Sequence, residues 1–357
     1  MAEPPLTALL SQALVAFTVE ADNEFERRMP HRTTSGPDRG NRPAGPWLVS
    51  MAMWFNCLRH LDDGGIALAD LERRCGLQTN LRGMHRWGYI TVEPGRVVRP
   101  TRRGREAREA WRPLPDEIEG RWAERFGAAA VGRLRDALGT LLGGDERFAR
   151  LPDFLPILGY GLSTRRGLRR VERAPDPAGS DAGLVALLAR ALLGFALAFE
   201  RDAPLSLAMS ADVVRVIEPE GVHVKDLPRR GGVSKEAIAM GLGFLERRQL
   251  AVVGPDPQGG RHKRARLTAE GLQARRDYAD RLAGLERAAA RRAGHDTIAG
   301  LRAALAPIVI GPAGDGSSPL WRGLDPYPDG WRASVPRPET LPHFPMVLHR
   351  GGYPDGA

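Results

Sequence analysis

The stretch that decides the fold runs from Gly221 to Gly271 and reads GVHVKDLPRRGGVSKEAIAMGLGFLERRQLAVVGPDPQGGRHKRARLTAEG. Alternating valines predict a short strand at its start, and a short helix over 225–230 ends at a pair of glycines. Ser234 is a natural N-cap for a second helix, whose apolar stripe recurs at helical spacing: Ile238, Leu242 and Leu245. Two further strands are predicted over 250–253 and 265–268, with a glycine- and proline-rich turn between them.

Strand, helix, turn, helix and a two-stranded ribbon with a basic tip together make a winged helix-turn-helix. The ordered patterns GVSKEAIAMGLGFLERRQLAVV (232–253) and RARLTAEGLQARRDY (264–278) resemble the MarR family of bacterial transcription regulators. MarR proteins work as homodimers, in which long terminal helices pack together and two winged helices reach two DNA half-sites. The resemblance therefore implies a helical hub that carries DNA-binding winged helices.

The same order of patterns occurs twice in the chain. GIALADLERRCGL (65–77) matches GVHVKDLPRRGGV (221–233) at a constant offset, and LTALLSQALVAFTVEADN (6–23) matches LVALLARALLGFALAFERD (184–202). GYITV likewise matches QLAVV, but the first copy lacks five residues inside its second helix. An internal repeat indicates that one structural unit is present twice. By its resemblance to MarR homodimers, the chain is expected to be a monomer that acts as a covalent pseudo-dimer.

These patterns predict a mostly α fold with small β-wings, in the α+β class. Four segments are expected: the first repeat over 1–150, a linker over 151–182, the second repeat over 183–310 and an extended tail over 311–357 packed on the hub. Long helices of both repeats are expected to form the hub: 6–28, 121–142, 184–199 and 282–308.

The C-terminal tail has an unusual composition. From Pro319 onward it contains eight prolines, which exclude a regular helix and favour extended backbone. Its aromatic residues make it too apolar for a free tail: Trp321, Tyr327, Trp331, Phe344 and Tyr353. The tail is interpreted as a strap over the hub, and a lid over a ligand or a docking arm for a partner are the alternatives.

The charge of the chain indicates an acidic partner. The 357 residues carry a formal charge of +9 and give a sequence pI of about 10.3. Two zones are basic, with 12 Lys or Arg against 5 Asp or Glu over 225–276 and 9 against 3 over 82–112. Such zones suit a polyanion, so double-stranded DNA is the expected partner.

The composition also bears on the cellular compartment and on contact with a membrane. The apolar runs are interrupted by arginine, and the N-terminus lacks the features of a secretory signal, so no membrane partner is expected. Two cysteines cannot form a disulfide framework. These features favour a cytoplasmic protein.

In a winged helix, the second helix of the motif enters the major groove and the wing reaches the backbone or the minor groove. The helix of the second repeat offers Ser234, Lys235 and Met240, of which Met240 can contact only a thymine methyl group. The wing is expected to contact phosphates or a narrow minor groove through Arg261, His262, Lys263, Arg264 and Arg266. The first repeat offers Thr79, Asn80, Arg82 and Arg86, although its shorter helix and wing also fit a purely structural half.

MarR-like proteins often hold small aromatic or anionic molecules between the hub and a winged helix. By that resemblance, a small aromatic or anionic effector would lie in a crevice lined by residues of the first repeat: Trp47, Met51, Trp54, Phe55, Arg59 and His60. Ordinary core packing is the alternative for each of these residues taken singly.

No metal, cofactor or active site is expected from the sequence. Four residues could be zinc ligands: Cys57, His60, Cys75 and His85. The second repeat has Val213 and Val216 in place of the first two, which indicates core positions; a thiol redox sensor is the alternative for the cysteines. Walker, GxSxG and HExxH motifs do not occur, so no enzyme is expected.

The expected function is regulation of transcription by two winged helices in one chain that bind DNA under the control of a small effector. The alternative is a winged-helix scaffold that binds a protein partner or a metabolite without reading DNA. The outward face with Ala239, Met240 and Gly243 favours the alternative, because these residues cannot hydrogen-bond to base edges. The two basic zones favour DNA.

Overall fold

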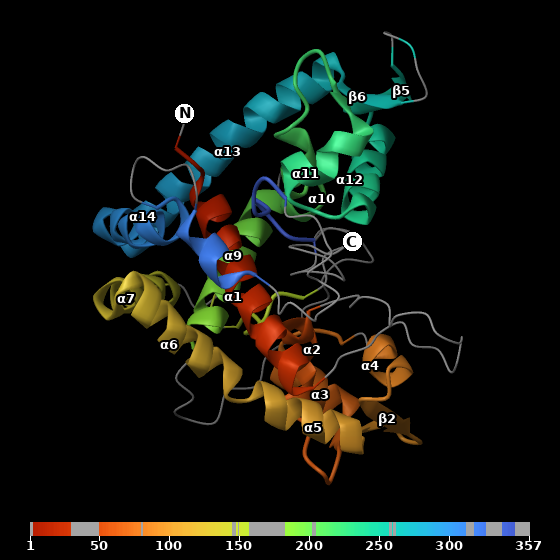
Figure 1. Cartoon of the computed structure of the whole chain (residues 1–357), viewed down its shortest axis with the longest axis vertical. Coiled ribbons are helices and arrows are strands. Elements are labelled where there is room, and N and C mark those ends of the chain that lie inside the picture. The colour runs from red at the N-terminus through yellow and green to blue at the C-terminus, as the bar shows by residue number, and fades with distance from the viewer. Residues whose placement is uncertain are drawn as a thin grey trace.

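The computed structural model describes residues 3–29, 50–79, 81–144, 148, 150–156, 183–201, 205–256, 259, 262–311, 318–325 and 338–346. These residues form mostly helices, together with two small antiparallel sheets. A hub of long helices lies on one side of the molecule, and two compact α/β units project from it toward opposite ends of the long axis (Figure 1). None of the described helices combines the length and apolar character that crossing a membrane requires.

The first unit contains three short helices, a three-stranded sheet and a closing helix. In chain order these are α2 (Met51–Leu58), β1 (Ile66–Ala67), α3 (Leu68–Cys75), α4 (Arg82–Arg86), β2 (Ile90–Glu93), β3 (Val97–Pro100) and α5 (Arg102–Trp111). The strands lie in the order β1-β3-β2, with Ile66 opposite Val98. Gly76 ends α3 in the left-handed region (φ 71°), which glycine adopts without a steric cost.

The second unit has the same order of elements. It contains α10 (Leu207–Val214), β4 (Val222–His223), the 3₁₀ turn η1 (Val224–Asp226), α11 (Leu227–Gly231), α12 (Lys235–Arg247), β5 (Ala251–Pro255) and β6 (Lys263–Leu267). Its sheet order, β4-β6-β5, matches that of the first unit. The helix expected over 225–230 is a 3₁₀ turn followed by α11. The predicted cap and stripe of α12 are confirmed: the Ser234 hydroxyl accepts a hydrogen bond from the Ala237 amide, 3.1 Å away, and the stripe is buried.

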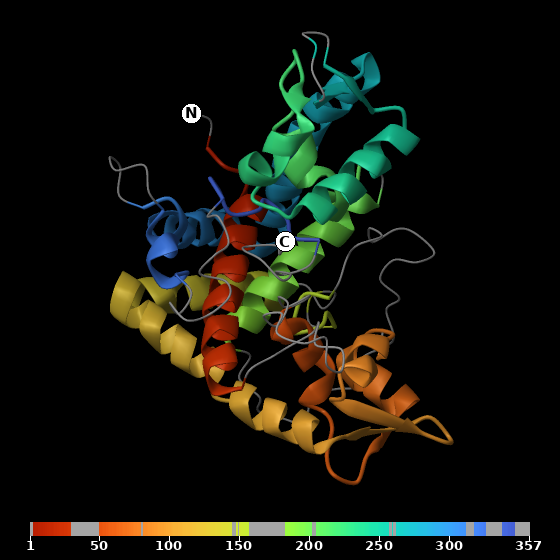
Figure 2. The same cartoon turned by 45° about the vertical axis from the view of Figure 1, so that its right-hand side comes forward.

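The hub contains helices from both halves of the chain: α1 (Leu6–Arg28), α6 (Leu114–Phe126), α7 (Ala128–Gly143), α9 (Leu184–Glu200), α13 (Ala269–Ala293) and α14 (His295–Val309). α1 and α9 pack side by side at its centre in both views (Figures 1 and 2), and α7 packs on α14. Because apolar residues occur on all faces of α1 and α9, both helices are buried along most of their length. The 3₁₀ turn η2 (Pro319–Gly323) packs against α1 and α14.

The continuous helix predicted over 121–142 is wrong. Gly127 separates α6 from α7 with a φ of 91°, and Gly294 separates α13 from α14 with a φ of 95°. A helix interior cannot contain a positive φ, so each glycine turns the chain. Each half therefore gives the hub a pair of helices joined by one glycine.

Both halves also require glycine after the return strand. Thr101 and Thr268 cap α5 and α13, and each hydroxyl accepts a hydrogen bond from the amide of the glycine three residues later. A Cβ atom on Gly104 would lie 2.0 Å from a backbone carbonyl oxygen, and one on Gly271 would lie 1.8 Å from another. No larger residue fits at either position, which explains why the pattern Thr-x-x-Gly occurs at both.

Candidate nucleic-acid interface and ligand pockets

α12 presents an outward face beside its buried stripe. Lys235 and Ala239 are exposed on this face, and Met240 is half-buried. Ser234 is only 7% exposed, and its hydroxyl is occupied by the cap to Ala237. The predicted DNA contact of Ser234 is therefore corrected, because a buried hydroxyl that holds the helix start is not available to a phosphate. Lys235 supplies the cation at the beginning of the face.

The wing of the second unit carries exposed cationic groups on β6. His262 and Lys263 are exposed where the strand begins, and Arg266 is half-buried farther along it. The side chain of Arg266 makes no hydrogen bond or ion pair to the described part of the chain. Arg261 lies outside the described residues. The wing thus exposes His262 and Lys263 at the start of β6 and leaves the Arg266 side chain half-buried on the other face of the strand.

Arg264 differs from its neighbours because it turns into the unit. Its side chain is 14% exposed and binds the buried carboxylate of Asp256 through two nitrogen atoms, at 3.2 and 3.1 Å. It also donates to the carbonyl oxygen of Gly221 at 3.1 Å, and His223 Nε2 lies 3.3 Å from the same Asp256 carboxylate. The predicted phosphate contact of Arg264 is therefore corrected: this arginine ties β6 to the end of β5 and to β4.

The first unit presents a shorter helix at the equivalent place. α4 has five residues, whereas α12 has 13. Arg82 and Arg86 are exposed on α4, and the guanidinium carbon of Arg86 lies 4.8 Å from the centre of the Trp87 ring. Thr79 is half-buried before the helix, and Asn80 lies outside the described residues. The first unit therefore offers two arginines on little more than one helical turn.

Most residues predicted to line an effector crevice lie in packed core. Met51 is fully buried, and Trp54 and Phe55 are each 7% exposed. Trp54 packs edge-on against a core tyrosine, with 5.4 Å between ring centres. His60 is half-buried just after α2, and Trp47 lies outside the described residues. Core packing, the alternative that the sequence left open, accounts for these apolar side chains.

The first strap, residues 150–156, fills the space beside α2 where an effector was expected. The ring of Phe154 lies 5.8 Å from the ring of Phe55, and the guanidinium carbon of Arg59 lies 5.6 Å from the centre of the Phe154 ring. Arg59 also pairs with the carboxylate of Asp153. The predicted ligand contacts of Phe55 and Arg59 are therefore corrected, because the chain supplies its own aromatic ring and its own anion there.

The first strap joins the first unit to the other half of the hub. The side-chain amide of Asn56 on α2 donates to the carbonyl oxygen of Phe154 at 2.6 Å and accepts from its amide at 3.2 Å. Arg190 of α9 donates from Nε to Asp153 at 2.8 Å. These strap residues fall almost entirely in the stretch expected to be a linker, yet they form a packed connection.

The second strap, residues 338–346, makes matching contacts in the second half. Asp212 of α10 accepts hydrogen bonds from two amides of the strap, at 2.6 and 3.4 Å, and Gln12 of α1 donates to a strap carbonyl at 3.1 Å. Both straps contain Leu-Pro-x-Phe, which begins at Leu151 in one and at Leu341 in the other. Each strap therefore ties its own unit to the first helix of the opposite half.

The second strap also touches the turn that precedes α12. The amide of Glu339 donates to the carbonyl oxygen of Arg229 at 3.2 Å, and the two side chains form an ion pair. Gly232 in this turn has a φ of 75°, and a Cβ atom there would lie 2.2 Å from the carbonyl oxygen of Thr340. The second strap therefore packs directly against the turn that leads into α12. Tyr327, Trp331 and Tyr353 of the tail lie outside the described residues.

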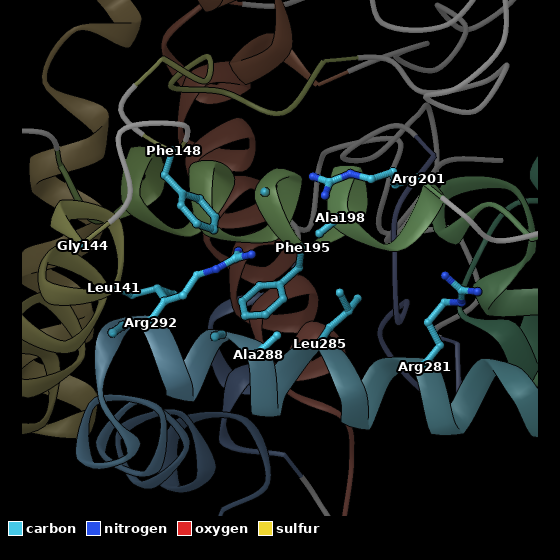
Figure 3. Close-up of a pocket in the computed structure, with 13 residues that line it drawn as sticks. Leu141, Gly144, Phe148, Phe195, Ala198, Arg201, Arg281, Leu285, Ala288 and Arg292 are labelled. Carbon is cyan, nitrogen blue, oxygen red and sulfur yellow. The ribbon is translucent and has the colours of Figure 1, made fainter.

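A cavity of about 220 Å³ lies in the hub where the end of α7, from the first half, meets α9 and α13 from the second half. Figure 3 shows Phe195 pointing from α9 toward α13, with Leu285 beside it and Phe148 at one end. The side chains of three arginines surround this apolar space: Arg201, Arg281 and Arg292. None of these residues stands out in the sequence, because their pattern is that of an ordinary pair of amphipathic helices.

The two cysteines lie together in the first unit. Both are buried, and their sulfur atoms are 3.7 Å apart. The hydrogen bond with Cys75 and burial raise the pKa of the Cys57 thiol well above its ordinary value. No group of three or more potential metal-binding side chains occurs in the part of the chain that the structure describes.

We expect the Cys57 thiol to be unreactive in the folded chain. A raised pKa leaves very little thiolate at neutral pH, and the thiolate is the nucleophile in alkylation. Labelling by iodoacetamide at pH 7.5 should be at least about tenfold slower than in urea, measured by intact mass. Rapid labelling of the folded protein would instead support a redox-sensing thiol.

The arrangement of both units is compatible with an α+β winged-helix fold. No protein-family model and no curated protein matches the chain. The chain is similar to the crystal structure of the PcaV transcriptional regulator from Streptomyces coelicolor in complex with its natural ligand, at 28% identity over 33% of this chain and 83% of that one, with a TM-score of 0.27. A second crystal structure of PcaV is 27% identical over 31% of this chain and 82% of that one, with a TM-score of 0.27. A TM-score this low does not establish a fold or a function.

Proposed function

We propose that the chain is a DNA-binding regulator of transcription, with two winged-helix units that act as an intramolecular pseudo-dimer. The observation that carries the proposal is the second unit, where the exposed Lys235 at the start of α12 accompanies the cationic residues Lys263 and Arg266 of the wing. A helix face with a basic ribbon beside it suits a major groove and the adjacent phosphates.

Matched pairs of contacts support the pseudo-dimer. Ser50 donates to Asp22 of α1 at the start of α2, and Ser206 donates to Glu200 of α9 at the start of α10. Figure 2 shows the two units at the same side of the hub, toward opposite ends. In this proposal the fused halves hold the units as two subunits of a symmetric dimer would. Their unequal helices, α4 and α12, would then read two unlike half-sites.

The proposal is tested by fluorescence anisotropy with a random duplex and with selected genomic fragments, at 50 and 200 mM salt. We expect salt-sensitive binding with preference for some fragments, because phosphate contacts release counterions. Replacing Lys263 and Arg266 together by alanine should weaken binding about tenfold on all sequences and lower the salt slope by about 2. Arg287→Ala on the exposed side of α13 is the matched control.

Absence of binding at 50 mM salt would overturn the DNA proposal. A double variant that changed sequence preference at unchanged affinity would contradict the phosphate role of the wing. The alternative, a winged-helix scaffold for a protein or metabolite, is favoured by one specific observation: Ala239 and Met240 on the outward face of α12 cannot hydrogen-bond to bases. A small aromatic or anionic effector is compatible with both proposals.

A further inference from the structure

The second strap, residues 338–346, lies where the hub, α10 and the turn before α12 meet. Its apolar side chains Leu341, Phe344 and Met346 are buried. On the hub side, the hydroxyl of Ser11 in α1 donates to the carbonyl oxygen of Pro342 at 2.8 Å. The strap therefore connects the second unit to the hub in addition to α13 and to the passage of the chain from α9 into α10.

One route from the strap to α12 is direct and joins backbone to backbone. The Glu339 amide donates to the carbonyl oxygen of Arg229 at 3.2 Å. The Thr340 carbonyl oxygen lies so close to Gly232 that a Cβ atom on this glycine would be 2.2 Å from it. The turn itself is closed, because the Gly232 amide donates to the carbonyl oxygen of Pro228 at 2.9 Å. Strap and turn therefore have little freedom to move separately.

A second route passes through charged side chains. Asp212 of α10, which accepts hydrogen bonds from two strap amides, lies 3.5 Å from Nε of Arg215. The same arginine donates from a terminal nitrogen to the carbonyl oxygen of Gly231 at 2.8 Å. The strap, α10 and the end of α11 are thus joined by one continuous set of polar contacts.

The length of α12 amplifies any movement of the turn. The helix has 13 residues and, at about 1.5 Å each, is about 20 Å long. A rotation of the unit by about 10° at the start of this helix would shift the far end by about 3 Å, which is close to the spacing of successive base pairs. A small change in the turn is therefore enough to move α12 out of register with DNA.

We propose that the second strap positions α12 for DNA, with Glu339, Thr340 and Phe344 as positioning residues that act through the turn. Phe344 seats the strap, and the other two residues transmit its position. With the strap docked, the second unit has one orientation relative to the hub. With the strap released, the unit samples several orientations, and the affinity for DNA falls with the fraction that fits the groove. The effect on DNA rests on the proposed function, whereas the fixed orientation does not.

The orientation is measured without DNA, by double electron–electron resonance between two spin labels in the full chain. The labels are attached through Arg133→Cys on the exposed side of α7 and Arg247→Cys on the exposed side of α12, since both native cysteines are buried. We expect one narrow distance distribution in the labelled parent and a distribution at least about twice as broad in Phe344→Ala. Phe344→Leu, which keeps an apolar side chain in the seat, should retain the narrow distribution.

The duplicated strap motif provides a matched control. Phe154→Ala removes the same side chain from the first strap, which packs against α2 of the other unit, so the distribution should stay narrow. Glu339→Pro protects the test against misfolding, because it removes the amide donor and the ion pair to Arg229 but no buried side chain. This variant should also broaden the distribution.

A parental distribution in folded Phe344→Ala, or in Glu339→Pro if the alanine variant does not fold, would overturn the proposal. Equal broadening in Phe154→Ala would overturn it as well, because the effect would then be a general loosening. In anisotropy titrations of the unlabelled chains with a preferred fragment, Phe344→Ala should bind about tenfold more weakly and Phe344→Leu as the parent does. Unchanged DNA affinity in a chain with a broadened distribution would contradict the positioning role. A broadened distribution in a chain whose parent binds no DNA would refute only the proposed function.

Discussion

Replacing Phe344 by alanine is expected to destabilise the folded chain by about 3–5 kcal/mol, the usual cost of removing a buried phenylalanine. Phe344 is 1% exposed, and the second strap that carries it binds α1 through the carbonyl oxygen of Leu341 and α10 through the Phe344 amide. The measurement is urea unfolding followed by tryptophan fluorescence. Val252→Ala on the exposed face of β5 is the control, because a residue with 58% exposure should change stability by less than about 0.5 kcal/mol.

The equivalent change in the first strap gives an independent check. Phe154 is 5% exposed and packs against Phe55, so Phe154→Ala should lower the free energy of unfolding by a similar amount. Limited proteolysis of either variant should give new cleavage within the altered strap. If both variants unfolded at the parental urea concentration, the straps would not be docked parts of the fold.

The stability of the second strap is also expected to depend on pH through Asp212. Burial raises the pKa of this carboxyl from 3.8 to about 6, against the opposing effects of Arg215 and of the strap amides. The folded state therefore holds the proton more tightly than the unfolded state. Protonated Asp212 therefore adds about 3 kcal/mol to the free energy of unfolding. This stabilisation is fully present below about pH 4 and is lost as the pH rises through about 6.

The matched variant for this titration is Asp212→Asn. Asparagine does not titrate, and Asn56 holds the first strap at the equivalent position. The difference in unfolding free energy between the two proteins should change by about 3 kcal/mol between pH 4 and pH 7, in favour of the asparagine variant at pH 7. A difference independent of pH would mean that Asp212 titrates normally.

The second unit could be predicted from the sequence because its signals are local. The cap at Ser234 and the stripe of α12 lie within one helix, and the turn residues define the ribbon. Gly127 was not predicted to end a helix, because a single glycine among apolar residues at helical spacing is compatible with a continuous helix. Its positive φ is set by the packing of α7 on α14, which no local pattern reports.

The tail was expected to form a strap over the hub, but the contacts of both straps and of the sites could not be predicted, because they join distant residues. The strap motif is only four residues long and has no period, and its partners Asn56 and Asp212 lie in other helices. Arg264 belongs to a run of basic residues whose sequence does not distinguish an internal ion pair with Asp256 from a phosphate contact. The hub cavity likewise forms where helices from both halves meet.

The contrast between Trp122 and Ala289 has a consequence for how such a molecule can evolve. In a homodimer every mutation appears in both subunits, so a change that opens a binding space also weakens the second copy of the core. In a single chain the two positions mutate independently. The first half has Trp122 bonded to the buried carboxylate of Glu20, whereas the second half has Ala289 and Ala198 at the matching positions of the sequence. A single chain can therefore carry different side chains at two matching positions, which two identical subunits cannot do.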